Sequence, residues 1–156
     1  MHRATVSVVV ATLLAACHAD IESVPLAQQN IYFSDKFYDV AALGPEHAIV
    51  VGYGGKALET KDGGLSFTRL NTGTDLALFD VTTAGSHIWI AGQEGMILHS
   101  GDGGKTFEQQ KSGTPNYLFA IHFLNENRGF AVGDKSALTE TVDGGKTWTA
   151  RTLEVA

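Results

Sequence analysis

Short apolar segments alternate with turns rich in glycine and aspartate over residues 37 to 152. In the middle of this region the pattern predicts four strands, at Leu78 to Thr83, Ile88 to Gly92, Met96 to Ser100 and Thr106 to Gln110. Turn-forming residues separate them, namely Ala84-Gly85-Ser86, Gln93-Glu94-Gly95 and Asp102-Gly103-Gly104-Lys105. Because the chain has no long helical periodicity, we expect an all-β fold.

The same unit occurs three times at a spacing of about 40 residues. Each copy opens with one of three related triplets, Tyr38-Asp39-Val40, Phe79-Asp80-Val81 or Phe119-Ala120-Ile121. Each closes with an acidic turn, TKDGGLSF at 60–67, SGDGGKTF at 100–107 or TVDGGKTW at 141–148. A period in the forties with several short strands is typical of a β-propeller blade. We therefore predict a partial propeller of three four-stranded antiparallel blades, at about 37–70, 78–110 and 118–152.

The acidic turns resemble the Asp-box, or BNR repeat, of sialidases and of several non-catalytic propellers. The wider unit, an aromatic opener followed by a strand such as Gly129-Phe130-Ala131-Val132-Gly133 and then by the acidic turn, most resembles the photosystem II assembly and stability factor family. This resemblance implies a non-catalytic module that binds a protein or assists complex assembly. The alternative is a sialidase-type glycoside hydrolase relative or a carbohydrate-binding module, since a propeller fold serves many functions.

The Asp boxes have the composition of structural turns. An aspartate can accept backbone N–H groups, and the glycine after it supplies positive φ at little steric cost. A structural role is favoured because catalytic carboxylates seldom occur in equivalent triplicate, and calcium binding is the alternative, although each box has a single acid. The residues assigned this role are Asp62, Gly64, Phe67, Asp102, Gly104, Phe107, Asp143, Gly145 and Trp148.

The N-terminus has the features of an export signal. Arg3 precedes an apolar run from Val6 to Ala16 that is too short to span a membrane. The run ends in Leu14-Ala15-Ala16-Cys17, which resembles the lipobox of bacterial lipoproteins. We therefore expect a lipoprotein signal peptide at 1–16, lipidation of Cys17, a polar tether at 17–30 and repeats at 31–156. Ordinary cleavage that leaves a free thiol is the alternative.

This interpretation places the protein on the periplasmic face of a bacterial membrane. Lipidation makes anchoring stable, and His18 after the cysteine favours the outer membrane by family resemblance. The formal net charge of the chain is −6, and the basic residues are scattered among the repeats. This charge distribution argues against nucleic acid as a partner.

No residue set predicts an enzyme, a cofactor site or a metal site. Arg69 and Arg151 occupy equivalent positions of two repeats, so they and Arg128 are not expected to form a sialidase-like triad. The histidines lack ligand spacing and are interpreted as surface or core residues: His47, His87, His99 and His122.

Three blades are fewer than the four or more that close a propeller. The expectation is association, as a homodimer that completes a six-bladed ring or with a second polypeptide, although a truncated gene product is a further alternative. Ile31-Tyr32-Phe33 is a candidate extra strand. A partner surface is expected on the loops at 70–77 and 110–117 and on the turns at 44–47 and 85–87, with Tyr53 and Tyr117 exposed.

Overall fold

The computed structural model describes residues 34–151, and they form three four-stranded antiparallel sheets. The first sheet contains β1 (Phe37–Ala42), β2 (Ala48–Gly52), β3 (Ala57–Thr60) and β4 (Thr68–Leu70). The second contains β5 (Leu78–Ala84), β6 (His87–Gly92), β7 (Met96–Ser100) and β8 (Glu108–Lys111). The third contains β9 (Leu118–Phe123), β10 (Gly129–Gly133), β11 (Leu138–Thr141) and β12 (Thr149–Arg151).

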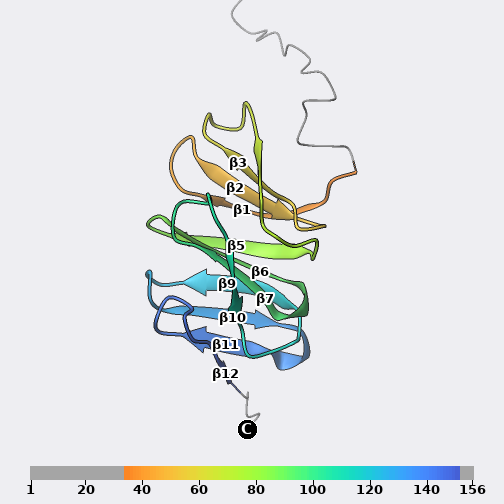
Figure 1. The fold of residues 1–156 in the computed structure, drawn as a ribbon, viewed down its shortest axis with the longest axis vertical. Coiled ribbons are helices and arrows are strands. Elements are labelled where there is room, and N and C mark those ends of the chain that lie inside the picture. Colours follow the sequence, from red (N-terminus) through yellow and green to blue (C-terminus); the bar gives the residue numbers. More distant parts are fainter. Residues whose placement is uncertain (1–33, 152–156) are drawn as a thin grey trace, which may run out of the picture.

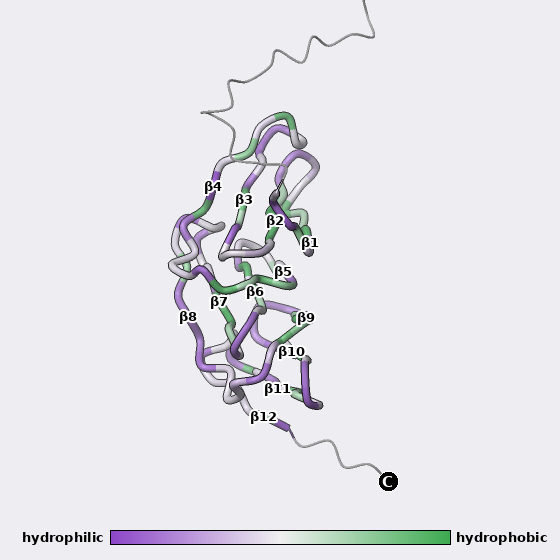
Figure 2. Tube along the Cα trace, turned by 90° about the vertical axis from the view of Figure 1, so that its right-hand side faces the viewer, coloured by the Kyte–Doolittle hydropathy of each residue, from purple (hydrophilic) through white to green (hydrophobic). Residues whose placement is uncertain are grey.

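The sheets stack as propeller blades, so the prediction of an all-β partial propeller is confirmed (Figure 1). In each blade the strands follow chain order, and the first strands β1, β5 and β9 come together along one side, which we call the inner edge (Figure 2). The fourth strands β4 and β8 follow the opposite, outer edge (Figure 2). The candidate extra strand at 31–33, the signal peptide, Cys17 and the tether lie outside the described residues.

The hydrophobic core lies between blades. One buried cluster joins Ile49 and Val51 of the first blade to Ile88 and Ile90 of the second. Another joins Trp89 of the second blade to Phe123 and other residues of the third. Because β6 alternates its side chains between two faces, it supplies both clusters and is buried along most of its length. The middle blade is therefore packed against both of its neighbours through β6.

The fourth strand of the middle blade begins later than its sequence predicts. The prediction was Thr106 to Gln110, whereas β8 begins at Glu108. Thr106 donates its backbone N–H and its hydroxyl to the Asp102 carboxylate at 3.0 and 2.7 Å, which keeps Thr106 in the turn. β6 begins one residue earlier than predicted because the hairpin turn is only Gly85-Ser86.

Between β6 and β7, the residues Gln93–Gly95 form a single 3₁₀ turn with Glu94 at φ 57°. Among the described residues, no helix is long and apolar enough to cross a membrane.

Candidate functional site

Each Asp box is a closed set of hydrogen bonds around one carboxylate. Asp102 accepts the backbone N–H groups of Lys105 and Thr106, both at 3.0 Å, and the hydroxyls of Thr106 and Ser100 at 2.7 Å. These bonds hold the pKa of Asp102 well below its ordinary value, and the bond from the Thr106 hydroxyl has the largest effect. Because these bonds stabilise the charged form, the carboxylate serves to hold the turn together.

The other two boxes repeat this arrangement. The Ser66 side chain and backbone lower the pKa of Asp62 to about 2, and the Thr147 side chain and backbone lower that of Asp143 to about 2. Asp62 accepts the Ser66 hydroxyl at 2.6 Å, and Asp143 accepts the Thr147 hydroxyl at 2.6 Å. Each of the three carboxylates thus accepts both the hydroxyl and the backbone N–H of the residue four positions later.

The hydroxyl two residues before each aspartate is a functional part of the turn that sequence reasoning left without a role. Thr60, Ser100 and Thr141 each accept the backbone N–H of the second box glycine at 2.8 Å. All three are buried. The signal was available in the sequence, because every box begins with a serine or threonine at this position.

The box glycines and aromatics of the second and third blades lie against the preceding blade. A methyl group on Gly104 would lie 3.4 Å from Cδ1 of Ile49, and one on Gly145 would overlap the amide of Gln110. Trp148 donates its Nε1–H to Gln110 at 3.0 Å and packs edge-on against Phe123. Phe107 packs against the cluster between the first and second blades. In the first blade Phe67 is half-buried, and Gly64 lies near its ring.

We predict that Asp102→Ala lowers the melting temperature, because the substitution removes the acceptor of four hydrogen bonds from the turn. Circular dichroism melting measures the effect. Asp75→Ala, which removes an exposed acid from the linker between β4 and β5, is the control and should leave the melting temperature unchanged. Equal melting temperatures for wild type and Asp102→Ala would contradict a structural role.

A second carboxylate contact, at the inner edge, was missed by sequence reasoning. Asp39 accepts the backbone N–H of Val81 in the next blade at 2.9 Å, and Asp80 accepts that of Ile121 at 2.6 Å. Burial, followed by the neighbouring Asp39 side chain, raises the pKa of Asp80 to about 6. The two aspartates occupy equivalent places in the opening triplets, whereas Ala120 holds that place in the third.

This raised pKa predicts a pH dependence of stability. Since the folded chain binds the Asp80 proton more tightly than the unfolded chain, stability from this group is present below about pH 4 and is lost as pH rises to about 6. Asp80→Asn keeps an acceptor for Ile121 without the charge. We expect it to be more stable than wild type by roughly 1 kcal/mol at pH 7, after allowance for solvent screening, and to lose that advantage at pH 4.

Urea denaturation at pH 4, 5, 6 and 7 measures this difference. Asp75→Asn serves as the charge-matched control and should show a constant difference from wild type over the same range. A stability gap between Asp80→Asn and wild type that does not change with pH would rule out the linkage to Asp80.

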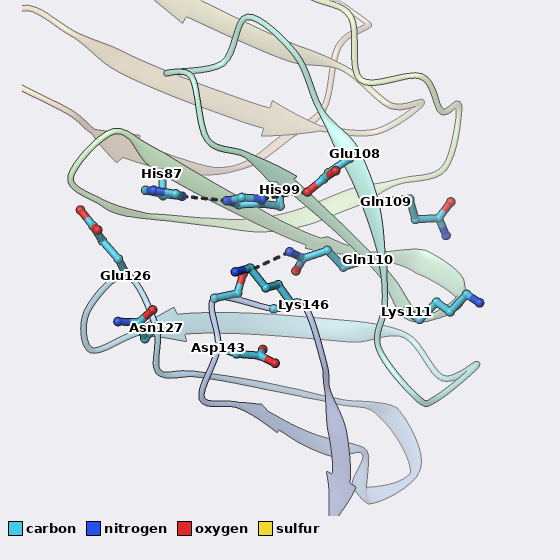
Figure 3. Close-up of a pocket in the computed structure, with 12 residues that line it drawn as sticks. His87, His99, Glu108, Gln109, Gln110, Lys111, Glu126, Asn127, Asp143 and Lys146 are labelled. Carbon is cyan, nitrogen blue, oxygen red and sulfur yellow. Dashed lines mark hydrogen bonds and ion pairs between the residues drawn. The ribbon is translucent and has the colours of Figure 1, made fainter.

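His87 and His99, interpreted from the sequence as surface or core residues, contact each other in the structure. Nδ1 of His87 lies 2.9 Å from Nε2 of His99, and Nδ1 of His99 lies 3.3 Å from Oε1 of Glu108 (Figure 3). The physical reason is the β6–β7 register, which sets Trp89 opposite His99 and so puts His87 diagonally beside it on the same face. Sequence spacing alone could not reveal this cross-strand contact.

This pair lies at one side of a groove of about 410 Å³ at the junction of the second and third blades. Asp143 and Lys146 of the third Asp box line the same groove (Figure 3). Within residues 34–151, no group of three His, Cys, Asp or Glu side chains is placed to hold a metal ion. His47, the counterpart of His87, contacts Glu59 at 2.8 Å instead.

The arginines do not converge. Arg69 is exposed on β4, Arg151 pairs with Glu140 on the outer part of the third blade, and the Arg128 guanidinium lies 5.5 Å from the ring centre of Phe130. Of the two tyrosines expected at the surface, Tyr53 is exposed, and Tyr117 is partly exposed while it contacts Phe79 and Phe119.

A family model described as Photosynthesis system II assembly factor YCF48 matches residues 18–116 and 106–156. The chain belongs to this family. Among solved structures it is similar to "YCF48 bound to D1 peptide", with 26% identity, a TM-score of 0.68 and coverage of 74% of this chain and 39% of that chain. It is also similar to YCF48 from Cyanidioschyzon merolae, with 26% identity, a TM-score of 0.65 and coverage of 74% and 37%.

The described propeller segment therefore spans about two-fifths of the length of these YCF48 structures. An ancestral GH74 enzyme is similar at a TM-score of 0.60 and 15% identity over 72% of this chain and 18% of that chain, a likeness that concerns the fold alone. No curated protein matches the sequence. The predicted resemblance to the photosystem II assembly factor family is thus confirmed.

Proposed function

We propose that this chain is a non-catalytic, protein-binding module that assists assembly of a membrane complex. The observation that carries the proposal is the similarity to a YCF48 structure that holds a D1 peptide. The carboxylates of Asp62, Asp102 and Asp143 support it, because all three serve turn geometry rather than a paired acid and nucleophile. The client of this chain is a protein segment.

Peptide binding tests this function. The full chain is titrated into a fluorescein-labelled D1 peptide, and anisotropy is compared with that of a scrambled peptide of the same composition. We expect saturable binding of the first and none of the second. Absence of binding together with hydrolysis of a glycoside would instead favour the sialidase-type alternative.

We further propose export and lipid anchoring at Cys17, which the lipobox-like Leu14-Ala15-Ala16-Cys17 supports. Expressed in a bacterium, the wild type is expected in the membrane fraction with incorporated palmitate label, and Cys17→Ser is expected to lose both. The acyl chains supply the membrane affinity, at about 0.8 kcal/mol per buried methylene. A Cys17→Ser protein that fractionates with membranes as fully as wild type would refute the anchor.

We also propose that the third blade associates with further blades, which come from a second copy of the chain or from another polypeptide. Its face away from the second blade carries Val132, which is 45% exposed, and the half-buried Phe130 and Leu138. The corresponding positions of the second blade, Trp89, Ala91 and Ile97, are fully buried against the third. Light scattering on the soluble chain tests this, since a cooperative monomer at micromolar concentration would contradict association.

A further inference from the structure

Each blade opens with a β-bulge whose extra residue is aromatic. In the first blade, Phe37 lies opposite Gly52 and Asp39 opposite Val51, so Tyr38 has no partner on β2. The same shift leaves Phe79 and Phe119 without partners on β6 and β10. A bulge turns the extra side chain out of the regular alternation of the strand. The repeat therefore points three aromatic rings along the inner edge.

These rings form a continuous ladder across the blades. The ring centres of Tyr38 and Phe79 are 5.5 Å apart, and those of Phe79 and Phe119 are 5.4 Å apart. Tyr117 joins the ladder from the linker before β9, at 6.1 Å from Phe79 and 6.4 Å from Phe119. Its hydroxyl accepts the side-chain amide of Gln93 at 2.9 Å, which fixes the ring in place.

The ladder remains accessible to a partner. Tyr38 is 46% exposed, Phe119 is 52% exposed and Tyr117 is 38% exposed. Burial of aromatic rings of this size against a partner is favourable. A contiguous exposed apolar patch commonly marks an interaction site. An extended peptide repeats its side chains on one face about every 6.6 Å, and the ring centres of adjacent rungs are 5.4 to 5.5 Å apart, so side chains two positions apart in the peptide reach neighbouring rungs.

The residues that follow the rungs add charge to this surface. Asp39, Asp80 and Ala120 come directly after Tyr38, Phe79 and Phe119 and line a groove of about 520 Å³ across the inner edge. Six of its ten lining residues are apolar, and among them Val40 is exposed. Of the basic residue types only a histidine, His122, lines this groove, and Arg128 lies beside it, over the ring of Phe130. The two adjacent carboxylates thus complement a basic side chain that approaches along the rings.

We infer that the ladder of Tyr38, Phe79, Tyr117 and Phe119, with the Asp39 and Asp80 groove beside it, docks an extended peptide that combines aromatic or apolar side chains with basic ones. The inference rests on the proposed protein-binding function and names the surface and the chemistry of the partner. The aromatic side chains of the peptide cover the rungs, and its basic side chains approach the two carboxylates.

Three short labelled peptides test the inference on the full chain by fluorescence anisotropy. They are Gly-Phe-Arg-Phe-Arg-Gly, the charge-reversed Gly-Phe-Glu-Phe-Glu-Gly, and Gly-Ser-Arg-Ser-Arg-Gly without aromatic rings. We expect the first to bind more tightly than either of the others. The double variant Tyr38→Ser/Phe119→Ser should weaken it about tenfold, and Asp80→Asn about threefold.

The controls are substitutions of comparable size away from the inner edge. Leu65→Ser/Val142→Ser removes two exposed apolar side chains from Asp-box turns, and Asp75→Asn removes one exposed acid. Both should leave the dissociation constant within about twofold. Circular dichroism melting establishes that each variant is folded, and the single variant Phe119→Ser replaces the double variant if the latter fails to fold.

Unchanged affinity of the ladder variant for the Arg-Phe peptide would overturn the ladder as the docking surface, and equal binding of the Glu-Phe peptide would overturn the basic partner. The D1 peptide, titrated into the same proteins, separates this inference from the proposed function. Its failure to bind wild type counts against that function. Equal binding of the D1 peptide to wild type and to the ladder variant counts against the ladder alone.

Discussion

Trp89→Ala is expected to destabilise the chain by about 3 to 5 kcal/mol, the largest effect we predict for a single side chain. Trp89 is fully buried between the second and third blades. Its ring stacks on Phe123 with centres 3.6 Å apart, and its Nε1–H donates to the carbonyl of Gly144 at 3.1 Å. The substitution leaves a cavity at the junction and a carbonyl of the third Asp box with one donor fewer.

Urea denaturation followed by far-ultraviolet circular dichroism measures the loss. Tyr53→Ala is the matched control, because it removes an aromatic ring that is 63% exposed, and it should change stability by less than about 0.5 kcal/mol. The junction would not depend on Trp89 if both variants unfolded at the same urea concentration as wild type.

Gly55→Ala is expected to cost at least about 3 kcal/mol. Gly55 has φ 67°, a left-handed conformation that by itself costs an alanine about 1 to 2 kcal/mol. An added methyl group would also overlap the carbonyl oxygen of Thr74, in the linker to the second blade. The backbone N–H of Gly55 donates to Leu76 at 2.8 Å, so relief of the clash would disturb that bond too.

The adjacent Gly54 separates these two costs. Gly54 has φ 68°, and a methyl group there would meet nothing within 4 Å. Gly54→Ala should therefore show the conformational cost alone, and urea midpoints of the two variants give the cost of the clash by difference. Equal destabilisation by the two substitutions would contradict the predicted clash, because it would mean that the linker moves away from the added methyl group at no cost.

The fold was largely predictable because its information is local and repeated. Alternating apolar residues set the strands, and the Asp boxes set one turn of each blade with hydrogen bonds that span only four residues, such as Asp143 to Thr147. Three copies in one register then distinguished a propeller from other all-β folds. The strand limits that differed, such as the start of β8 at Glu108, differed where a side chain competed with the strand for a backbone N–H.

The contacts between equivalent positions of different blades were not predictable in the same way. The Asp39 carboxylate meets a backbone N–H 42 residues away, and nothing local in the triplet distinguishes an inter-blade acceptor from a solvated acid. Tyr38, Phe79 and Phe119 have the sequence pattern of ordinary strand residues, and only the bulge turns them toward one another.

The sequence by itself therefore determined the blade, its number of strands, its Asp-box turn and the family to which the chain belongs. The tertiary structure alone decided the His87–His99 contact, the contacts of Asp39 and Asp80 with the next blade and the aromatic ladder at the inner edge. The physical reason is one of range. Turns and strands depend on neighbours within a few residues, whereas these sites depend on register between strands and on stacking between blades.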